Sequence, residues 1–526
     1  MRKPKVVIIG GGFGGMYTAT KLHKLSRGDL DIELISKINY FVYQPLLPEV
    51  AAGTLNPQDA VTPLRNLLNG ARVRLAEVTD IDFDAKQVIL LQGQRKILQR
   101  VDYDHLVITT GQVANLSLFP GFEHHSLTMK DLSDAYRLRN RVIECMEMAD
   151  VTRFPDIKQR ALTFVIGGAG FSGVETMGEL AEMVDRILPE YPNIQRHEIR
   201  LVMIQLGNRV LPELPEHLST YALNQLEKRG VEVWLNTGIH SATQHAIYTN
   251  DGRSLPTRTI VTTIGNGPSE FVKSLPIQLQ RGRIAVNAEL EVIGLSNVWS
   301  IGDAALVPLN TDQENPLYAP PTAQFAVAQA ELLAQNILHR TRGQNLATFT
   351  YKAAGIMASL GGGRGVAEIY GVRVTGIVAW VIWRAAYIGM LPGLATKVRV
   401  ALDWLFDFFM PRTIVYMAES DRPATRYLDY SQGEVVQYAN EVPAGFYIVL
   451  SGSLTQELEK DNGEPEHHEL HIGDSWGSRA LKEHRLTHGK ITAREDTRLL
   501  LVNSGDFQRL RSSYKPFNEL LSAGNK

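Results

Sequence analysis

Cysteine is nearly absent from this chain. Its 526 residues contain one cysteine, Cys145. A single cysteine excludes an intrachain disulfide, a CxxC redox pair and a cysteine-rich metal site. Any redox chemistry in this protein must therefore proceed without a pair of protein thiols.

The chain also lacks a charge imbalance and a long apolar run. Lys and Arg total 54 and Asp and Glu total 56, and the formal net charge of −2 gives no electrostatic basis for a nucleic-acid partner. No uncharged apolar stretch reaches the roughly 18 residues of a membrane-spanning helix. The start, MRKPK, runs directly into the strand-like Val6–Ile9 without the apolar segment of a signal peptide. We therefore expect a cytoplasmic protein.

The sequence does contain three distinct patterns, and its 526 residues suggest three to four domains of about 150 residues each. Up to about residue 350, β-branched runs alternate with helical stretches, which predicts an α/β fold with mainly parallel sheets. The runs are VVIIG, IELIS, HLVITTG, LTFVIGG, RLVMIQ, TIVTTIG and NVWSIGD. Residues 351–415 are aromatic and punctuated by glycine, with poor strand character. After a linker at Pro411–Arg426, short alternating runs predict a small all-β unit from residue 427 onward.

Two glycine-rich motifs each lie between a predicted strand and a predicted helix. The first consists of Gly10, Gly12, Phe13, Gly14 and Gly15, and the second of Gly168, Gly170 and Gly173. In each, the first glycine allows a tight turn, the second lets the backbone approach a pyrophosphate, and the third lets the helix pack on the strand. The N-terminus of the helix favours the phosphate charge. Because the strand–helix context is present twice, the sequence predicts two bound dinucleotides.

The residue that ends the second strand of each unit departs from the usual pattern. An acidic side chain normally binds the ribose hydroxyls there, but this chain has Ser36 in the first unit and Gln205 in the second. Ser36 can still form a hydrogen bond with a ribose. Gln205 removes the negative charge that would repel a 2′-phosphate, and Arg209 follows, so we expect NADPH to be accepted alongside or in preference to NADH. The alternative is that Gln205 simply binds the ribose in place of a carboxylate.

Two later segments resemble motifs of flavoproteins that have two dinucleotide-binding domains. They are HLVITTG, which contains Thr110 and Gly111, and NVWSIGD, which contains Gly302 and Asp303. The resemblance implies that Asp303 contacts the ribityl chain of FAD, although an aspartate after a strand can also be a turn residue or a helix cap. It implies an FAD-binding domain at 1–120 and 268–350, with an NAD(P)H-binding domain inserted at 121–267.

Longer motifs show which group of these flavoproteins the chain resembles most. Flavin reductases of this fold often use a cysteine pair, as does the sulfide:quinone branch, and a lone Cys145 excludes both. The matching segments are SKINYFVYQPLLPEVAAGTLNP (36–57), GGAGFSGVETMGEL (167–180), SIGDAALVP (300–308), APPTAQFAVAQAELLAQN (319–336), YKAAGIMASLGGGRGVAE (351–368) and the segment 376–412. Over about residues 3–415 the chain resembles the type II NAD(P)H:quinone oxidoreductases, single-subunit enzymes that do not pump protons.

This resemblance implies specific site residues. Asn39 to Leu47 would approach the flavin ring, and Gly265, which ends TIVTTIG, would lie at the nicotinamide nucleotide. Glu175 would lie near the nicotinamide and take part in proton delivery, or it is merely a first-turn glutamate that stabilises the helix dipole. Ala323 and Gln324 belong to the family's AQxAxQ quinone motif, whose last Gln is here Ala328. Gln329 follows, but one residue on a helix turns a side chain by about 100°, so it is not a simple substitute.

Residues 376–410 are the most apolar part of the chain. Along the second half, Arg399, Asp403 and Asp407 recur every four residues and form a narrow polar stripe, in which Arg399 and Asp403 can pair. Trp380, Trp383 and Trp404 suit a ring at headgroup depth, so we expect helices that lie in one leaflet of a membrane. The alternative is a hairpin packed on the protein's own core or on a dimer partner. In the resembling family this region, here 351–415, both forms a homodimer and docks on the cytoplasmic face of a membrane.

The C-terminal region at 427–526 resembles a cyclic-nucleotide-binding roll. Its phosphate cassette normally has Gly-Glu and, later, an arginine, but here Gly477 is followed by Ser478, and Thr487 takes the expected arginine position near Arg485. Without a placed guanidinium the phosphate loses its bidentate partner, so we expect weak or absent cyclic-nucleotide binding. The histidines near residue 468 lack the spacing of a metal site, and no metal is expected.

Taken together, the sequence predicts a peripheral membrane flavoenzyme with FAD as cofactor. It would oxidise NADH or NADPH and reduce a membrane quinone, without proton pumping. Two other functions remain open: a soluble flavin reductase for a protein acceptor, and a redox-sensing regulator that reports NAD(P)H through the C-terminal roll.

Overall fold

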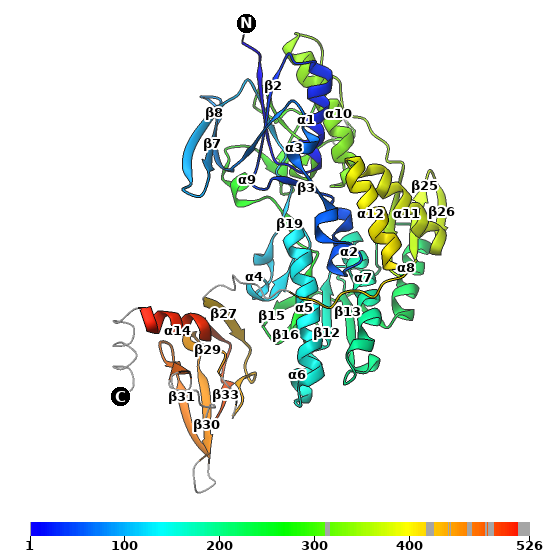
Figure 1. Ribbon diagram of the computed structural model, residues 1–526. Helices are drawn as coiled ribbons and strands as arrows, with labels where there is room; N and C mark the ends of the chain where they lie inside the picture. Colours follow the sequence, from blue (N-terminus) through cyan, green and yellow to red (C-terminus); the bar gives the residue numbers. More distant parts are fainter. Residues whose placement is uncertain are drawn as a thin grey trace.

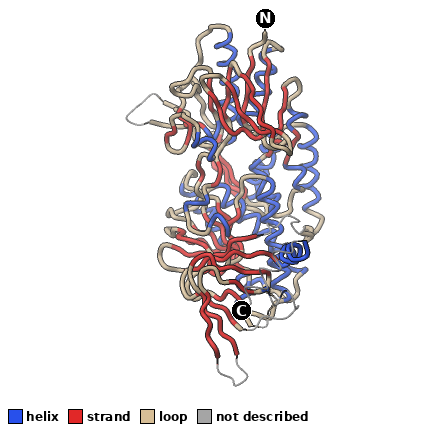
Figure 2. The backbone as a smooth tube through the Cα atoms, turned by 90° about the vertical axis from the view of Figure 1, so that its left-hand side faces the viewer, coloured by secondary structure: helices blue, strands red, loops and turns tan. Residues whose placement is uncertain are grey.

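The computed structural model describes residues 2–310, 316–416, 425–439, 441, 443–459, 465–478, 481 and 489–513. Two α/β units lie one above the other in Figure 1, with a pair of helices along one side and an all-β roll at the other. The α/β fold with an additional C-terminal all-β domain that the sequence predicted is confirmed. Figure 2 shows the strands of the two units gathered into separate sheets, with helices around them.

The upper unit is built on a five-stranded parallel sheet in the order β22-β9-β1-β2-β5. These strands are β1 (Lys5–Ile9), β2 (Asp31–Ser36), β5 (Arg72–Leu75), β9 (His105–Ile108) and β22 (Val298–Ser300). β1 is almost wholly buried, as expected for a central strand covered on both faces. Helices α1 (Phe13–Ser26) and α10 (Ala323–Thr341) pack against each other on one face. The smaller elements of this unit are β3 (Tyr40–Val42), α2 (Leu47–Ala51), β4 (Val61–Pro63), α3 (Leu64–Leu67), β6 (Glu77–Asp82), β7 (Gln87–Gln92), β8 (Ile97–Asp102), α9 (Glu270–Ser274), β20 (Leu279–Gln280), β21 (Arg283–Ala285) and β23 (Ala305–Leu306).

The lower unit repeats this design with a second parallel sheet in the order β11-β18-β12-β13-β14. Its strands are β11 (Ser126–Leu127), β12 (Thr163–Gly167), β13 (Arg200–Ile204), β14 (Val231–Trp234) and β18 (Thr259–Thr262). Its helices are α4 (Phe122–His125), α5 (Leu132–Val151), α6 (Pro155–Ala161), α7 (Phe171–Ile187) and α8 (Glu216–Lys228), and a side sheet contains β15 (Ile239–Ala242), β16 (Ala246–Thr249) and β17 (Ser254–Pro256). The two passages of the chain between the units pair with each other as β10 (Val113–Ala114) and β19 (Asn266–Gly267).

The region after residue 350 contains more strand than the sequence suggested. The expectation of poor strand character is wrong, because β24 (Gly355–Ser359), β25 (Gly365–Ile369) and β26 (Val372–Thr375) form an antiparallel sheet. Gly361, Gly362 and Gly363 have positive φ and make the tight turn between β24 and β25, so here glycine marks a hairpin rather than a break in structure. Helices α11 (Gly376–Met390) and α12 (Leu394–Asp407) follow. Among the described residues, no helix combines the length and apolar character that a bilayer-spanning helix requires.

The C-terminal roll consists of two four-stranded sheets, β27-β34-β29-β32 and β28-β33-β30-β31. Their strands are β27 (Thr425–Tyr430), β28 (Val435–Gln437), β29 (Gly445–Ser451), β30 (Leu454–Glu459), β31 (Pro465–Leu470), β32 (Ser475–Trp476), β33 (Lys490–Ala493) and β34 (Thr497–Asn503), and α14 (Ser504–Ser513) follows. The roll has an apolar core of its own, which includes Tyr447, Leu454 and Leu499. A separate apolar core runs through both α/β units and takes in Trp383, Val400 and Trp404. The roll is therefore a distinct folding unit attached to one continuous body.

Candidate functional site

The first glycine motif forms a tight loop between β1 and α1. Gly10 has a φ of +110°, and a Cβ there would lie 2.4 Å from the backbone oxygen of Thr109. A Cβ at Gly15 would lie 1.9 Å from the Gly10 oxygen, whereas a Cβ at Gly12 would meet nothing within 4 Å. Gly14 packs on Thr109 and Ile301, and α1 begins at Phe13 without a side-chain cap. The loop therefore leaves open space and unsatisfied N–H groups where an anionic group can bind.

The second glycine motif has the same geometry between β12 and α7. Gly168 has a φ of +100°, a Cβ at Gly173 would lie 1.9 Å from the Gly168 oxygen, and a Cβ at Gly170 would meet nothing within 4 Å. Gly265, with a φ of +75°, lies where the chain leaves this unit, and its oxygen accepts a hydrogen bond from the Asn115 nitrogen at 2.6 Å. The structure thus offers two equivalent loops for two dinucleotide phosphates.

The two residues that replace the usual carboxylates lie differently. Ser36 is buried beside the first loop, and its Oγ accepts a hydrogen bond of 3.3 Å from the Ile38 nitrogen. Gln205 turns toward the second loop, and its Oε1 accepts a hydrogen bond of 2.9 Å from the Ala169 nitrogen. Arg209 donates to the Pro212 oxygen at 2.5 Å. Gln205 therefore supports the backbone of the glycine loop and carries no charge at the strand end.

The late motifs converge on the first loop. Gly302 has a φ of +70°, and its nitrogen donates to Oε1 of Gln329 at 2.7 Å. Burial raises the pKa of Asp303, and the charges of Lys130 and Arg283 oppose that shift. Gly111 has a φ of +67° beside Thr110, whose Oγ1 is buried without a hydrogen-bond partner among the described residues. Open backbone at the loop and an unsatisfied buried hydroxyl fit a bound FAD, whose phosphates and polar groups would complete this site.

A 260 Å³ cavity lies between α1, α10 and the end of α11. Its lining is mainly aromatic and apolar and consists of Phe13, Tyr17, Tyr43, Ala323, Gln324, Val327, Ala328, Glu331, Tyr351 and Met390. The Nε2 of Gln324 donates to the Gly355 oxygen at 3.2 Å, and its buried Oε1 has no partner among the described residues. Ala328 lines the cavity, whereas Gln329 is turned away to Gly302. Asn39 is exposed outside the lining, and its backbone oxygen accepts from the Leu64 nitrogen at 2.9 Å.

Glu175 is a buried carboxyl in the first turns of α7, with 6% of its surface exposed. Its Oε1 accepts hydrogen bonds from the Ser359 nitrogen at 3.0 Å and from Nε1 of Trp383 at 3.2 Å. Burial raises the pKa of Glu175 to about 8, although both hydrogen bonds oppose the shift. At neutral pH this carboxyl therefore carries a proton that it can donate.

Aromatic rings connect Glu175 with the cavity. The Trp383 ring lies 4.3 Å from the Tyr387 ring, which lies 5.7 Å from the ring of Tyr43 in the cavity wall. Burial also raises the pKa of Tyr387 well above its usual value. The sequence did not indicate that these three rings meet, because Tyr43 lies far from Trp383 and Tyr387 in the chain. Only the spacing of Trp383 and Tyr387, four residues apart on one helix, placed two of them on one face.

A buried cluster of charges lies beneath α11 and α12 and was missed in the sequence. Burial, together with the charge of the neighbouring Glu179, raises the pKa of Glu49 to about 8. The guanidinium of Arg384 lies 3.5 Å from Glu49 and over the ring of Trp380, 3.9 Å from its centroid. Arg412 lies 4.0 Å from Glu179. The one available signal was that Glu179 follows Glu175 by four residues and so shares its helix face.

Two expectations for the apolar segment are wrong. Trp380, Trp383 and Trp404 are buried in the protein, because their rings cover charged groups; Nε1 of Trp404 donates to Glu49 at 2.7 Å. Arg399 does not pair with Asp403 but lies 3.8 Å from Asp59, while Asp403 accepts from the Asn56 nitrogen at 3.1 Å. Asp407 binds Arg186 at 2.7 Å. Asp403 and Asp407 of the polar stripe thus face the protein body, while Arg399 is largely exposed at its edge.

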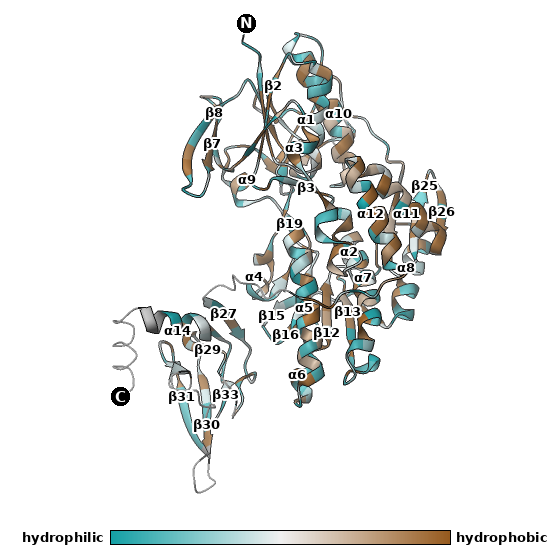
Figure 3. Ribbon diagram, viewed as in Figure 1, coloured by the Kyte–Doolittle hydropathy of each residue, from teal (hydrophilic) through white to brown (hydrophobic). Residues whose placement is uncertain are grey.

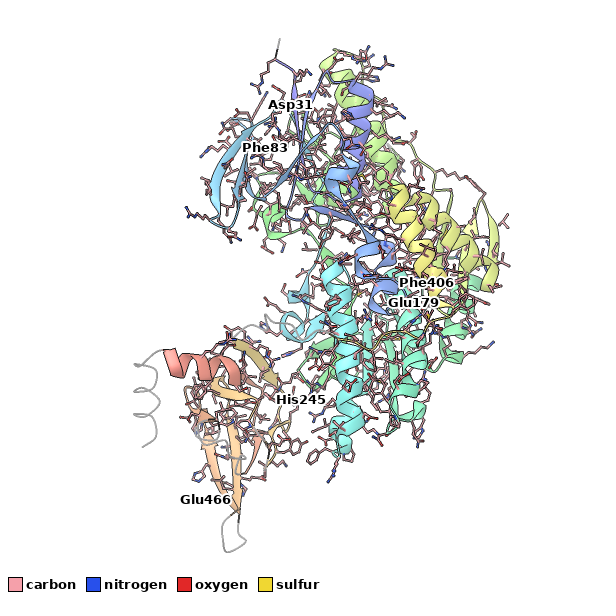
Figure 4. The ribbon with its side chains drawn as sticks, viewed as in Figure 1. Asp31, Phe83, Glu179, His245, Phe406 and Glu466 are labelled. Carbon is pink, nitrogen blue, oxygen red and sulfur yellow. The ribbon has the colours of Figure 1, made fainter. Side chains whose placement is uncertain are left out.

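The outward surface of the two helices is apolar instead. Its exposed side chains are Ile377, Val378, Val381, Met390, Leu394, Val398, Leu402, Leu405, Phe406, Phe408, Phe409 and Met410, and we call this set the apolar face. Figure 3 shows hydrophobic colouring on α11, α12 and the neighbouring β25–β26 hairpin, and Figure 4 labels Phe406 on α12. Met390 belongs both to this face and to the cavity wall. The cavity wall and the apolar face therefore meet at this residue.

In the roll, Gly477 has a φ of +92° at the end of β32, with Ser478 beside it. Arg485 and Thr487, on which the expectation for a cyclic phosphate depends, lie outside the described residues. No three His, Cys, Asp or Glu side chains gather as a metal site would need in the part of the chain that the structure describes.

The chain is similar to proteins of known activity over most of its length. Residues 4–330 match the family described as pyridine nucleotide-disulphide oxidoreductase, 354–413 the NDH2 C-terminal domain and 427–514 the cyclic nucleotide-binding domain. The type II NADH:quinone oxidoreductase of Mycobacterium tuberculosis is 31% identical over 430 residues, which cover 78% of this chain and 89% of that one. The enzyme of the same name from Staphylococcus aureus is 31% identical over 71% of this chain and 92% of its own. NDH2 from Plasmodium falciparum in complex with NADH has the same fold, with a TM-score of 0.73, 21% identity and coverage of 79% and 100%.

Proposed function

Because the chain belongs to the type II NADH:quinone oxidoreductases, FAD-dependent enzymes that pass electrons from NADH to a quinone, we propose that it performs this reaction as a peripheral protein on the cytoplasmic face of a membrane. The observation that carries the proposal is the cavity of 260 Å³ whose wall shares Met390 with the apolar face. A quinone dissolved in lipid could enter there without crossing water. We also propose that the reaction proceeds without proton pumping and that the enzyme is a homodimer.

The residues around the two loops have distinct proposed roles. When bound, FAD accepts hydride from the nicotinamide and delivers two electrons to the quinone. The loop at Gly10–Gly15, with Asp303, would hold the FAD, and the loop at Gly168–Gly173 would hold the NADH. The cavity lining, which includes the rings of Phe13, Tyr43 and Tyr351, would enclose the flat quinone ring.

Glu175 is the proposed proton donor. Reduction of a quinone to a quinol takes up two electrons and two protons; the hydride accounts for both electrons and one proton, so one further proton must be delivered. A carboxyl with a pKa of about 8 is protonated at neutral pH and can supply it. Its hydrogen bonds from Ser359 and Trp383 hold Oε1 in place. The tilted rings of Trp383 and Tyr387, whose centroids are 4.3 Å apart, connect this carboxyl with Tyr43 in the cavity wall.

We further propose that NADPH is accepted beside NADH. Gln205, which directly follows β13, is an uncharged amide, and its Oε1 is engaged by the Ala169 nitrogen. A carboxylate at this position would repel a 2′-phosphate, and an amide would not. Steady-state kinetics with both nucleotides and a soluble quinone test this proposal, and a hundredfold preference for NADH would contradict it.

The membrane proposal is tested by flotation of the purified flavoprotein with vesicles of neutral phospholipid. Exposed Phe406 and Phe409 are changed to Glu, and the matched control is Val151→Glu, because Val151 is 77% exposed at the end of α5. We expect the Phe406→Glu/Phe409→Glu variant to remain in solution while it keeps NADH oxidation with a soluble quinone, since burying each charge in lipid costs about 2 kcal/mol or more. Flotation equal to that of the control would overturn the assignment of this face to the membrane, and light scattering of the detergent-free protein would then show whether a second copy covers it.

A further inference from the structure

The roll docks on the second dinucleotide unit, and its first contact is charged. Oδ2 of Asp429 on β27 lies 3.1 Å from Nε2 of His125 on α4, and Oδ1 accepts from Nε of Arg498 at 2.6 Å. The His125 side chain is only 5% exposed. Burial would raise the pKa of Asp429, but the hydrogen bonds from His125 and Arg498 hold it at about 2. The interface therefore contains an ionised carboxylate with partners on both of its sides.

A second contact lies at the loop between β15 and β16. Oε1 of Glu434 accepts hydrogen bonds from the Tyr248 hydroxyl at 3.0 Å and from Thr243 Oγ1 at 3.1 Å. The ring of His245 meets the ring of Tyr430 edge-on at 5.4 Å. Burial lowers the pKa of His245 to about 3, so this histidine is neutral at physiological pH. Figure 4 labels His245 on the side of the body that faces the roll.

A third contact is made by Tyr438. Its hydroxyl donates to Oδ2 of Asp156 at the start of α6, and its ring lies parallel to that of Phe154 at 6.3 Å. The three contacts come from three separate elements of the dinucleotide unit, and they are polar or aromatic rather than a shared aliphatic core. A cavity of 350 Å³ lined by both partners lies beside them. Such a surface suits a folded module that can dock and release as a unit.

The docked element α4 is fixed to β15 of the side sheet. Gly121 begins this helix with a φ of +80°, and a Cβ there would lie 1.8 Å from the Ala242 oxygen on β15. The Ala242 nitrogen donates to the Pro120 oxygen at 2.9 Å. A displacement of His125 is therefore transmitted to β15, because no space separates the two backbones.

An apolar cluster completes the connection to the loop. Phe122 of α4 packs in one cluster with Ile239, and Ile264 packs against the same cluster. A Cβ at Gly168 would lie 2.5 Å from Cγ2 of Ile264, and a Cβ at Gly167 would lie 2.7 Å from Cδ1 of Ile239. The side chains that hold α4 thus also touch the backbone of the second glycine loop.

From these contacts we infer that docking of the roll strengthens binding of the nicotinamide nucleotide at the second loop. The inference rests on the proposed assignment of that loop to NADH. With the roll docked, α4 and the loop are already ordered; with the roll released, the nucleotide must order them, and its affinity falls. Coupling of this kind is reciprocal, so a bound nucleotide also tightens the docking.

The experiment measures this coupling in the full flavoprotein with NAD⁺, which occupies the site without reducing the flavin. Calorimetry first establishes NAD⁺ binding, and its absence would defeat the assignment of the loop rather than the coupling. We then expect saturating NAD⁺ to slow hydrogen exchange at residues 425–430 of β27, with no change at 465–470 of β31. Unchanged exchange at 425–430 with NAD⁺ bound would overturn the inference.

The same coupling can be tested in reverse, by altering the docking contacts and measuring the affinity for NAD⁺. Asp429→Asn and Glu434→Gln together remove the two carboxylate charges of the docking contacts, and Tyr438→Phe removes the third contact's hydroxyl, all with little change in shape. Asp474→Asn, in the turn between β31 and β32, is the matched control. We expect the dissociation constant for NAD⁺ to rise about fivefold in the triple variant and to stay unchanged in the control. The rate at saturating NADH should not change, because none of the four residues contacts the proposed reaction site. Equal dissociation constants in the triple variant and the control would contradict the inference.

Discussion

The two glycine loops have the same backbone and different surroundings. In both, the first glycine has positive φ, and the third would place a Cβ 1.9 Å from the oxygen of the first. Two residues after the third glycine, however, the first unit has Tyr17 at the wall of the cavity and the second has the buried carboxyl of Glu175. The glycines therefore specify a dinucleotide, and the chemistry of each site comes from the side chains that the helix presents next.

The largest expected effect tests whether the two glycine loops bind their ligands independently of each other. In both Gly15→Ala and Gly173→Ala the new methyl group would collide with a backbone oxygen at 1.9 Å, so each helix must move off its strand. We expect Gly15→Ala to lose the flavin and with it all activity. Gly173→Ala should keep the flavin and lose at least ~100-fold in kcat/KM for NADH, while its chemically reduced form still reduces quinone.

The measurements are the flavin content per chain and the rates of the two half-reactions. Gly505→Ala serves as the control, because its Cβ would be 3.6 Å from the nearest atom, an ordinary contact. Loss of flavin from both glycine variants alike would show that the two units do not bind their ligands independently.

The second-largest expected effect is on the pH dependence of kcat, which we attribute to the protonation of Glu175 on α7. Burial raises the pKa of Glu175 from the ordinary 4.5 to about 8, so the neutral, proton-donating form prevails below pH 8 and is lost above it. We expect kcat with quinone to fall as the pH rises through about 8. In Glu175→Gln, kcat should drop by about 100-fold at pH 7, and this inflection should disappear.

Flavin reduction by NADH under anaerobic conditions checks the assignment, because it consumes no proton from this carboxyl and should change little in Glu175→Gln. Glu182→Gln, on the same helix, is the control. An inflection near pH 8 that survives in Glu175→Gln would assign the titration to another group, and Glu49, with a pKa also raised to about 8, would be the first to test.

A smaller effect, on the preference between NADPH and NADH, is expected when the residue at the end of the second strand of each unit is changed. Gln205→Glu can still accept the hydrogen bond from the Ala169 nitrogen, now 2.9 Å from Oε1, and adds a negative charge. We expect kcat/KM for NADPH to fall about tenfold while that for NADH changes by less than about twofold, since only the 2′-phosphate is repelled. The matched variant Ser36→Asp in the first unit should leave the ratio of the two nucleotides unchanged. Equal losses with both nucleotides in Gln205→Glu would show that the charge disturbs the loop itself.

Much of this arrangement was predictable because it is local in sequence. The glycine spacing, the β-branched strands and a helix beside each motif follow from neighbouring residues, and the structure has them, with α1 beginning at Phe13 and α7 at Phe171. The insertion of one unit into the other followed from the late segment at Gly302. These features depend on backbone sterics, which a short stretch of sequence determines.

What could not be predicted depends on distant partners. The amphipathic pattern of α12 was visible, but its orientation was not, because Asp59 and Arg186 attract its charges from other parts of the chain. In the same way, the sequence shows Trp404 only as an aromatic residue in an apolar segment. Its hydrogen bond to Glu49, more than three hundred residues earlier, is visible only in the structure. Buried carboxyls reverse the usual rule that the polar side of a surface helix faces outward.

The smallest expected effect concerns Tyr17, which occupies the position in the first unit that Glu175 occupies in the second. Tyr17→Phe removes a hydroxyl that donates to the Met390 oxygen over 3.3 Å, a long and partly solvated hydrogen bond. A hydrogen bond of this kind contributes about 0.5–1 kcal/mol, so kcat/KM for the quinone should fall only two- to fivefold, with flavin reduction by NADH unchanged. A loss as large as that in Glu175→Gln would mean that the Tyr17 hydroxyl itself delivers a proton. A small loss would show that burial of the carboxyl, rather than its place two residues after the third glycine, makes Glu175 the reactive member of the pair.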